Sequence, residues 1–217
     1  MDYSNVTDGI LLVDKPRVIT SYRVVEHVKR ILKIKKVGHA GTLDPAAEGL
    51  LIILMGKSTK LSEQYMNQQK EYIGWMLLGV KTDSGDREGN ILCRKAVGQL
   101  RQDEIKKIID CFKGEIEQIP PMYSALKKDG KPLYVYARKN IQVERPKRKV
   151  NIYHIELLDI MMPYILLKVV CSRGTYIRTL CEDIAEKLGT VGTLYSLIRT
   201  RSGGSHLKNA VGIEEIR

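Results

Sequence analysis

The chain has no long hydrophobic run and little of what builds metal or disulfide sites. The longest apolar run, Gly49 to Met55, is far shorter than the roughly 20 residues that a membrane-spanning helix needs. The four cysteines lie 18, 60 and 10 positions apart, which matches neither a zinc site nor a redox motif. The four histidines are equally dispersed, and no basic-then-apolar export signal opens the chain. We therefore expect a cytoplasmic protein with reduced thiols, no membrane span and no metal.

Positive charge is plentiful and concentrated. The sequence has 36 Lys and Arg against 25 Asp and Glu, a net charge of +11. Net charge alone leaves two alternatives open, a polyanionic partner or simple solubility. Two stretches, Lys15 to Lys36 and Lys127 to Lys149, carry +7 each, so the rest of the chain is −3. This concentration favours a surface that contacts the phosphates of a nucleic acid.

The apolar spacing predicts strands and helices that are mixed along the chain without a regular βαβ order, a linker or a repeat. At 217 residues the chain fits one large domain or two small ones. We predict an α+β domain with a mixed sheet. One predicted helix follows Thr20 or Ser21, a second begins near Gly56, and two more cover 105–112 and 175–188. The predicted strands cover residues 10–13, 50–55, 72–80, 91–97, 141–143, 150–158 and 164–171.

The segment Gly38 to Pro45 (GHAGTLDP) joins a predicted helix to a predicted strand. Its two glycines permit close approach of another backbone, and loops between rigid elements often carry reactive groups. It lacks the lysine pattern of a nucleotide phosphate loop. Taken alone, an aspartate before proline is more often a turn or cap residue than a catalytic one.

This loop resembles the signature loop of the TruB-type pseudouridine synthases, whose aspartate is the catalytic nucleophile. Further segments resemble the other motifs of that family, in the family's order, from about Gly9 to about Ser205. The resemblance implies a pseudouridine synthase fold with a mixed, mainly antiparallel central sheet flanked by helices. The matching segments are 14–16 with 20–21 (DKP, TS), 70–79, 82–89, 120–138, 171–178 (CSRGTYIR) and 197–203.

Three features depart from the family pattern. Val18 stands where the first motif usually has glycine, so the turn after Pro16 must avoid a positive φ angle or be strained. Ile198 stands where a second arginine usually precedes Arg199, which removes one phosphate or structural contact. Family members usually continue into a small C-terminal RNA-binding domain of the PUA type. We expect residues 1–217 to form a single catalytic domain without it.

The resemblance assigns the chemistry to three residues. Asp44 would attack or stabilise the sugar carbon as the C1′–N1 bond of a uridine breaks. Aspartate side chains, whose ordinary pKa is about 3.9, need no activating base at neutral pH. Arg178 would hold this carboxylate in a charge-assisted pair, although a helix-surface salt bridge is the alternative. Tyr72 would stack on the uracil, although a core aromatic is the alternative.

Other residues would bind the RNA. His39 would act as a wedge or stacking partner for the extruded base, or be only a turn residue. Lys15 would brace the loop or contact a phosphate, and Leu197 would pack beneath the base or in the core. Asp83 and Asp86 lie in a glycine-rich turn that lacks calcium-loop spacing, so turn chemistry is favoured. From the second basic stretch we predict RNA contacts by Lys127, Arg138, Lys147 and Arg148.

The prediction is thus a cofactor-free, monomeric enzyme that isomerises uridine to pseudouridine in the T-loop of tRNA, at position 55. Two alternatives stay open. One is a pseudouridine synthase of the guide-RNA-dependent group, and the other is a non-catalytic tRNA-binding or tRNA-folding protein on the same fold. Binding alone requires no nucleophile, so the presence of Asp44, Tyr72 and Arg178 favours the enzyme.

Overall fold

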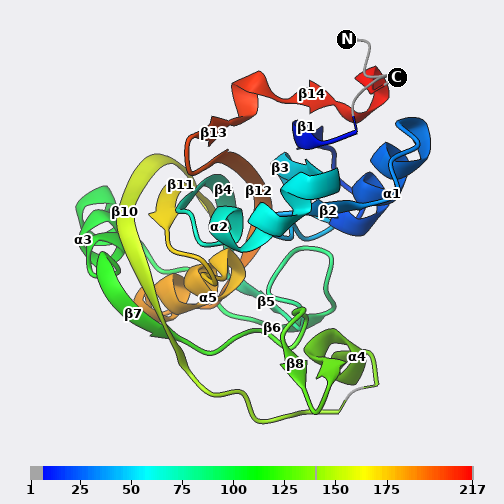
Figure 1. Ribbon diagram of the computed structural model, residues 1–217. Coiled ribbons are helices and arrows are strands. Elements are labelled where there is room, and N and C mark those ends of the chain that lie inside the picture. The colour runs from blue at the N-terminus through cyan, green and yellow to red at the C-terminus, as the bar shows by residue number, and fades with distance from the viewer. Residues whose placement is uncertain (1–6, 140, 217) are drawn as a thin grey trace. The chain divides into compact units, whose positions relative to one another are not determined.

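A computed structural model describes residues 7–139 and 141–216 of the chain (Figure 1). The chain divides into two compact units. Unit 1 comprises Met1–Ile73 and Leu197–Arg217, and unit 2 comprises Gly74–Ser196. Strands β4 (Lys70–Leu78) and β12 (Gly192–Ser202) have residues in both units. Within the described residues, no helix has the length and apolarity that crossing a bilayer needs.

Unit 1 is built around β3, which is buried along almost its whole length. On one edge β3 pairs with β1 in antiparallel register from Gly9↔Met55 to Lys15↔Gly49. On its other edge it pairs with β2 from Met55 to Ile53 and runs parallel to β12 at Arg199↔Gly49. The elements are β1 (Gly9–Lys15), α1 (Ser21–Ile31), β2 (Val37–His39), β3 (Glu48–Met55), a 3-10 turn η1 (Gly56–Leu61), α2 (Ser62–Met66), β13 (Ser205–His206), η2 (Leu207–Asn209), β14 (Val211–Gly212) and η3 (Ile213–Glu215).

The two faces of β3 bury different side chains because successive residues of a strand point to opposite sides. Leu51, Ile53 and Met55 pack with Val24 and Val28 of α1. Leu50, Ile52 and Leu54 pack on the other face with Ala40. A continuous apolar strand is typical of a sheet covered on both sides, and this explains the run that the sequence shows.

The helix predicted after Thr20 or Ser21 is α1. Thr20 is its N-cap, and the Thr20 hydroxyl accepts a hydrogen bond from the backbone N–H of Arg23 at 3.1 Å. Ser21, Val24, Val25 and Val28 form its buried face. Its basic residues therefore lie on the outer side, as an amphipathic helix requires.

In unit 2 the strands follow the order β12, β4, β11, β10, β7. This unit also contains the helices α3 and α5. The long strands β10 and β11 form an antiparallel hairpin, and β10 also pairs with β7. The elements are β5 (Val80–Thr82), β6 (Ile91–Arg94), α3 (Gln102–Asp110), β7 (Gly114–Gln118), β8 (Lys127–Lys128), β9 (Lys131–Pro132), α4 (Leu133–Ala137), β10 (Arg148–Met161), β11 (Tyr164–Cys171) and α5 (Ile177–Lys187).

The mixed sheet confirms the predicted α+β fold class, since β1–β14 and β3–β12 are parallel, whereas β1–β3, β2–β3, β10–β11 and β7–β10 are antiparallel. The strand predicted at 141–143 is wrong, because this segment has no regular structure and leads directly into Pro146. The strand predicted at 91–97 is shorter, and it pairs with β5 at Thr82↔Ile91. The single catalytic domain stays a prediction.

Candidate active site

The segment Gly38–Pro45 leaves β2 at His39 and has no regular structure between Ala40 and β3. Ser21, the first residue of α1, anchors its centre. The Ser21 hydroxyl donates to the carbonyl of Leu43 at 3.0 Å and accepts from the Leu43 N–H at 2.9 Å. The residue just before Asp44 is therefore fixed to the start of a helix.

The residue just after Asp44 is anchored as well. The Pro45 carbonyl accepts a hydrogen bond from the Val18 N–H at 2.9 Å and lies 3.5 Å from the ammonium of Lys15. Asp44 is half-buried, and its carbonyl accepts from the Ala47 N–H at 3.0 Å. Fixed neighbours on both sides restrict the directions in which the Asp44 carboxylate can point, which is what a positioned nucleophile requires.

Lys15 is fully buried, and its ammonium donates to the carbonyls of Pro16 and Ile19 at 2.9 Å each. Burial lowers the pKa of Lys15 to about 8, and nearby Arg199 acts in the same direction, whereas Glu48 and Asp44 favour the charged form. A buried ammonium bonded to carbonyls is not accessible to a phosphate. The structure therefore favours the bracing role over the predicted phosphate contact.

Arg199 provides a third anchor, which the sequence did not single out as a site residue. Its side chain is only 1% exposed. Its Nε donates to the carbonyl of Leu50 in β3 at 2.7 Å, and its Nη2 donates to the carbonyl of Gly41 at 3.0 Å. The only sequence signal was its position inside the matching segment 197–203. A buried guanidinium needs such acceptors, because an uncompensated charge is costly in the interior.

His39 is the last residue of β2, directly before the anchored loop, and it is half-buried. Its Nδ1 is enclosed and has no hydrogen-bond partner among the described residues. Burial lowers the pKa of His39, and the positive charge of Arg199 lowers it further. The lowered pKa favours the neutral imidazole, which suits stacking against a base better than pairing with a phosphate.

Tyr72 and Leu197 belong to unit 1, as Asp44 does. Tyr72 is half-buried in β4, and Leu197 is 8% exposed in β12. Both positions fit a packing role, so the predicted contacts of these side chains with the uracil stay predictions.

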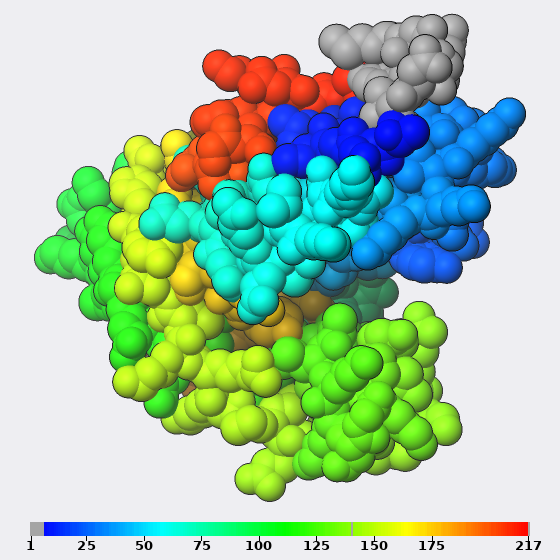
Figure 2. Space-filling model, viewed as in Figure 1, coloured from blue at the N-terminus to red at the C-terminus, as the bar shows by residue number. Residues whose placement is uncertain are grey.

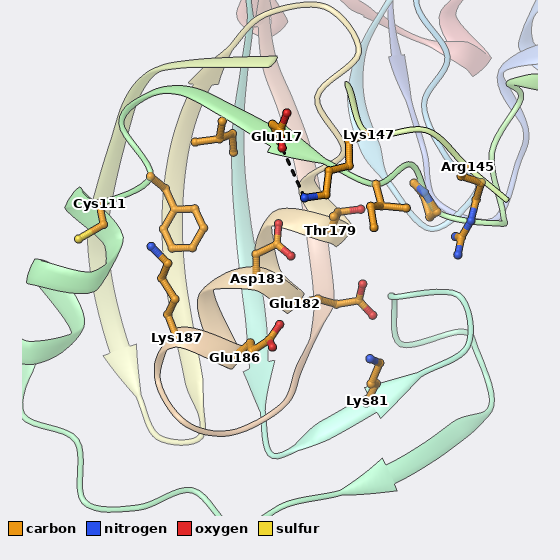
Figure 3. A pocket seen from close by; sticks show the side chains of 14 residues that line it. Lys81, Cys111, Glu117, Arg145, Lys147, Thr179, Glu182, Asp183, Glu186 and Lys187 are labelled. Carbon is orange, nitrogen blue, oxygen red and sulfur yellow. Dashed lines mark ion pairs between the residues drawn. The ribbon is translucent and has the colours of Figure 1, made fainter. Parts of the chain in front are cut away.

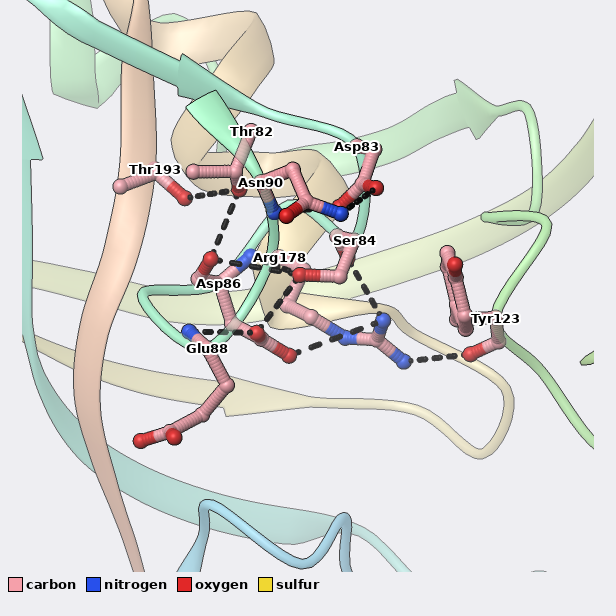
Figure 4. A network of polar contacts seen from close by, with 9 residues as sticks. All are labelled: Thr82, Asp83, Ser84, Asp86, Glu88, Asn90, Tyr123, Arg178 and Thr193. Carbon is pink, nitrogen blue, oxygen red and sulfur yellow. Dashed lines mark hydrogen bonds and ion pairs between the residues drawn. The ribbon is translucent and has the colours of Figure 1, made fainter. Parts of the chain in front are cut away.

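Arg178 belongs to unit 2 and is buried at the start of α5 (Figure 4). Its Nη1 donates to the carbonyl of Ser84 at 2.7 Å, and its Nη2 donates to the carbonyl of Tyr123 at 2.8 Å. The Asp86 carboxylate lies 3.9 Å from Nη1. Arg178 thus joins two of the matching segments, 82–89 and 120–138. Its pairing with Asp44 stays a prediction.

The turn between Thr82 and Asn90 is closed by its own polar side chains (Figure 4). Asp83 accepts from the backbone N–H and the side-chain amide of Asn90 at 2.9 and 3.0 Å. Asp86 accepts from the Ser84 hydroxyl at 2.7 Å and from the Glu88 N–H at 3.1 Å. These bonds account for both aspartates by turn chemistry, in agreement with the prediction.

The predicted RNA-binding residues of unit 2 lie at exposed positions. The Arg138 guanidinium stacks on the Tyr134 ring at 5.4 Å, and Lys127 is in the short strand β8. Lys147 pairs with Glu117 of β7 at 3.4 Å, and Arg148 begins β10. Glu117 offsets part of the charge of this basic stretch, and RNA contact by these four residues stays a prediction.

Lys147 also lines a cavity of about 940 Å³ in unit 2 (Figure 3). Three acidic side chains of α5 and Glu117 of β7 line it beside four basic side chains. The acids are Glu117, Glu182, Asp183 and Glu186, and the bases are Lys81, Arg145, Lys147 and Lys187. Burial raises the pKa of Asp183 to about 6, and the neighbouring Glu186 adds to the effect. The four acids balance the four bases, so the cavity has no excess positive charge for a phosphate.

The structure therefore brings Lys15, His39 and Asp44 together around one loop with Arg199 and Val18. A family model described as TruB family pseudouridylate synthase (N terminal domain) matches residues 29–177. The chain belongs to this family.

Named relatives of the TruB family agree with the assignment. A tRNA pseudouridine synthase B from Clostridium tetani is 50% identical over 209 residues, which are 96% of this chain and 72% of the relative. The enzyme of that name from Bordetella avium is 46% identical over 212 residues, covering 97% and 87%. The predicted family and fold are confirmed.

Solved structures of the same fold include the chain of a Cbf5–Nop10–Gar1 complex, with a TM-score of 0.76 and 31% identity. The match covers 96% of this chain and 53% of that one. An H/ACA RNP bound to a substrate RNA containing 2′-deoxyuridine matches with a TM-score of 0.71 and 28% identity. The two relatives named above are more similar in sequence than either of these structures.

Proposed function

We propose that this TruB-family chain isomerises uridine to pseudouridine in tRNA, at position 55 of the T-loop, with Asp44 as the nucleophile. The observation that carries the proposal is the anchoring of the signature loop at Gly41, Leu43 and Pro45, around a half-buried Asp44. Relatives at 45–50% identity bear the name tRNA pseudouridine synthase B, which supports tRNA as the substrate.

The reaction is an isomerisation that requires no redox partner. The C1′–N1 bond of the uridine breaks, the freed uracil turns, and a C1′–C5 bond forms. C5 loses its proton and N1 gains one, so the atoms and electrons balance. Departure of the uracil leaves C1′ electron-poor, and a fixed carboxylate stabilises it either by charge or by forming a bond.

We assign supporting roles to Arg178 and Tyr72. Arg178 would pair with the Asp44 carboxylate, and the half-buried Tyr72 would stack on the uracil. His39, whose neutral form is favoured by burial and Arg199, would occupy the space that the extruded base leaves. We propose that the protein acts as a monomer in the cytoplasm.

Replacing Asp44 tests the proposal directly. Asp44→Asn keeps the size of the side chain and removes its charge, so pseudouridine formation in a T-arm RNA should fall by roughly 10⁴-fold or more. RNA binding should persist, because the phosphate contacts remain. Nucleotide-resolution mapping of pseudouridine and a binding titration measure the two effects. The exposed Asp103→Asn in α3 is the matched control. Undiminished activity of Asp44→Asn would end this assignment.

The same assay separates the alternatives. A guide-dependent enzyme would be inactive on a bare tRNA transcript and would need a guide RNA and partner proteins. A non-catalytic tRNA-binding protein would bind the transcript and leave its uridines unchanged. Activity of the purified chain on a bare transcript supports the proposal against both.

A further inference from the structure

A groove of about 960 Å³ lies beside α1 in unit 1, and Ile19, Val25, Val37 and Ile213 form its apolar side. Arg23, Lys29 and Arg30 line it together with Tyr22 and His27. The buried face of α1 is formed by valines and Ser21, so these polar residues have no part in the core. Figure 2 shows α1, in mid blue, at the surface of the molecule.

The groove lies in the part of unit 1 where positive charges most outnumber negative ones. From Arg23 to Lys36 there are six Lys and Arg, all exposed, and Glu26 is the sole acid. The six are Arg23, Lys29, Arg30, Lys33, Lys35 and Lys36. Such a concentration is not needed for solubility, and it attracts a polyanion.

Glu26 is itself occupied. It accepts a hydrogen bond from the Tyr22 hydroxyl, and this bond raises the pKa of Tyr22. The bond holds the tyrosine ring against the helix, where 65% of the residue is exposed. An exposed ring among guanidinium and ammonium groups is typical of surfaces that bind single-stranded or looped RNA.

His27 also lines the wall, but its Nε2 is enclosed and has no hydrogen-bond partner among the described residues. An enclosed nitrogen is not open to a ligand, so this atom does not contribute to binding. The groove thus combines positive charge with an exposed stacking surface.

The groove is connected to the candidate active site through α1. Ser21 at the start of the helix holds Leu43, the neighbour of Asp44, through its hydroxyl. Lys29 lies eight residues further along, which is about 12 Å at the rise of an α-helix. A nucleic acid whose base reaches Asp44 therefore has backbone close enough to follow α1.

We propose that the α1 groove binds the backbone of the RNA substrate on the flank of the target uridine. The proposal rests on the proposed function for the identity of the RNA. Lys29 and Arg30 contact phosphates, and the Tyr22 ring packs against a base or a ribose.

The test compares Lys29→Gln/Arg30→Gln with the parent in binding to an unmodified tRNA transcript over a range of salt concentrations. Loss of two phosphate contacts should weaken binding roughly tenfold at low salt and reduce the slope of log K against log salt by about 1.5. Tyr22→Ala should weaken binding without changing the slope. Lys57→Gln/Lys60→Gln, which alters two exposed lysines of η1, is the matched control and should bind within about twofold of the parent.

An unchanged slope in Lys29→Gln/Arg30→Gln, or one equal to that of the control, would overturn the proposal and leave the groove to another partner, such as an acidic protein. Circular dichroism confirms that the variants are folded. Binding is measured independently of catalysis. If the parent binds tRNA but forms no pseudouridine, the proposed function alone is contradicted. If the parent is active and Lys29→Gln/Arg30→Gln has the same salt slope as the parent, the groove proposal alone is contradicted.

Discussion

Val18 has a backbone conformation that β-branched residues rarely adopt. Its φ angle is +76°, in the left-handed region, and its side chain is 85% exposed. Of the two expectations for this departure from the family pattern, the strained one holds. The Val18 N–H binds the Pro45 carbonyl, so the strained residue directly supports the segment that follows Asp44.

Glycine at this position should stabilise the protein. Val18→Gly removes the steric penalty and sacrifices almost no buried surface, so the free energy of unfolding should rise by about 1 kcal/mol. Val18→Ala keeps a Cβ atom in the same conformation and should gain less. Urea unfolding of the three proteins measures the difference. A loss of stability in Val18→Gly would contradict the strain.

Arg199 should affect turnover more than RNA binding. Its Nε and Nη2 reach two carbonyls, and a lysine has one nitrogen for both. In Arg199→Lys the Gly41 end of the loop should loosen and kcat should fall at least tenfold, because small misplacements of a reacting group are costly. Hydrogen exchange in residues 38–47 should rise at the same time.

The control is Arg201→Lys, since Arg201 is a quarter exposed and its Nε lies 3.8 Å from Glu71. It should retain kcat within about twofold. Equal kcat in Arg199→Lys and the parent would show that the loop does not need this anchor.

At the scale of elements, α5 contains a carboxyl group, that of Asp183, whose ionisation lowers the stability of the folded state. Burial raises the pKa of Asp183 to about 6, above the ordinary value of about 3.9. Between these values the folded state binds more protons than the unfolded state, so this group lowers stability as pH rises. Its cost is complete above about pH 6 and absent below about pH 4.

Asp183→Asn removes this ionisation. At pH 7.5 the variant should be more stable than the parent by on the order of 1 kcal/mol after solvent screening is considered, and the gain should vanish below about pH 4. Thermal melting across this pH range measures it, with Asp103→Asn as the control. A gain that does not depend on pH would point to packing instead.

Elements with a clear apolar period were predictable, and those with buried polar groups were not. α1 and β11 follow the regular spacing of their apolar residues. β12 was missed because Thr193, Arg199 and Ser202 are buried in it and interrupt any hydrophobic pattern. Short strands such as β2 depend on a partner distant in sequence, which local pattern does not reveal.

The candidate site shows the same division. The motifs around Asp44 and Arg178 indicated which residues to propose as reactive groups, because a resemblance marks residue types in order, and these roles stay predictions. The anchoring by Arg199 was not predictable, since it depends on two carbonyl directions that no side-chain pattern encodes. For Lys15 the sequence left bracing and phosphate contact open, and its burial, which the sequence does not show, favours bracing.

For the molecule as a whole, the net charge of +11 should appear in the salt dependence of RNA binding. Affinity for tRNA should fall steeply with ionic strength, with log K linear in log salt, because cations released from the RNA backbone drive binding. The rate at saturating RNA should change much less. A flat salt response would contradict binding through phosphates.

Unit 1 draws its residues from both ends of the sequence, with all of unit 2 encoded between them. Arg199, the partner of Gly41 and Leu50, therefore leaves the ribosome only after all of unit 2 has been synthesised. During translation the loop around Asp44 lacks this anchor for the whole of that interval. A nascent chain, surrounded by tRNA throughout its synthesis, thus completes the anchoring of this loop only after unit 2 has emerged.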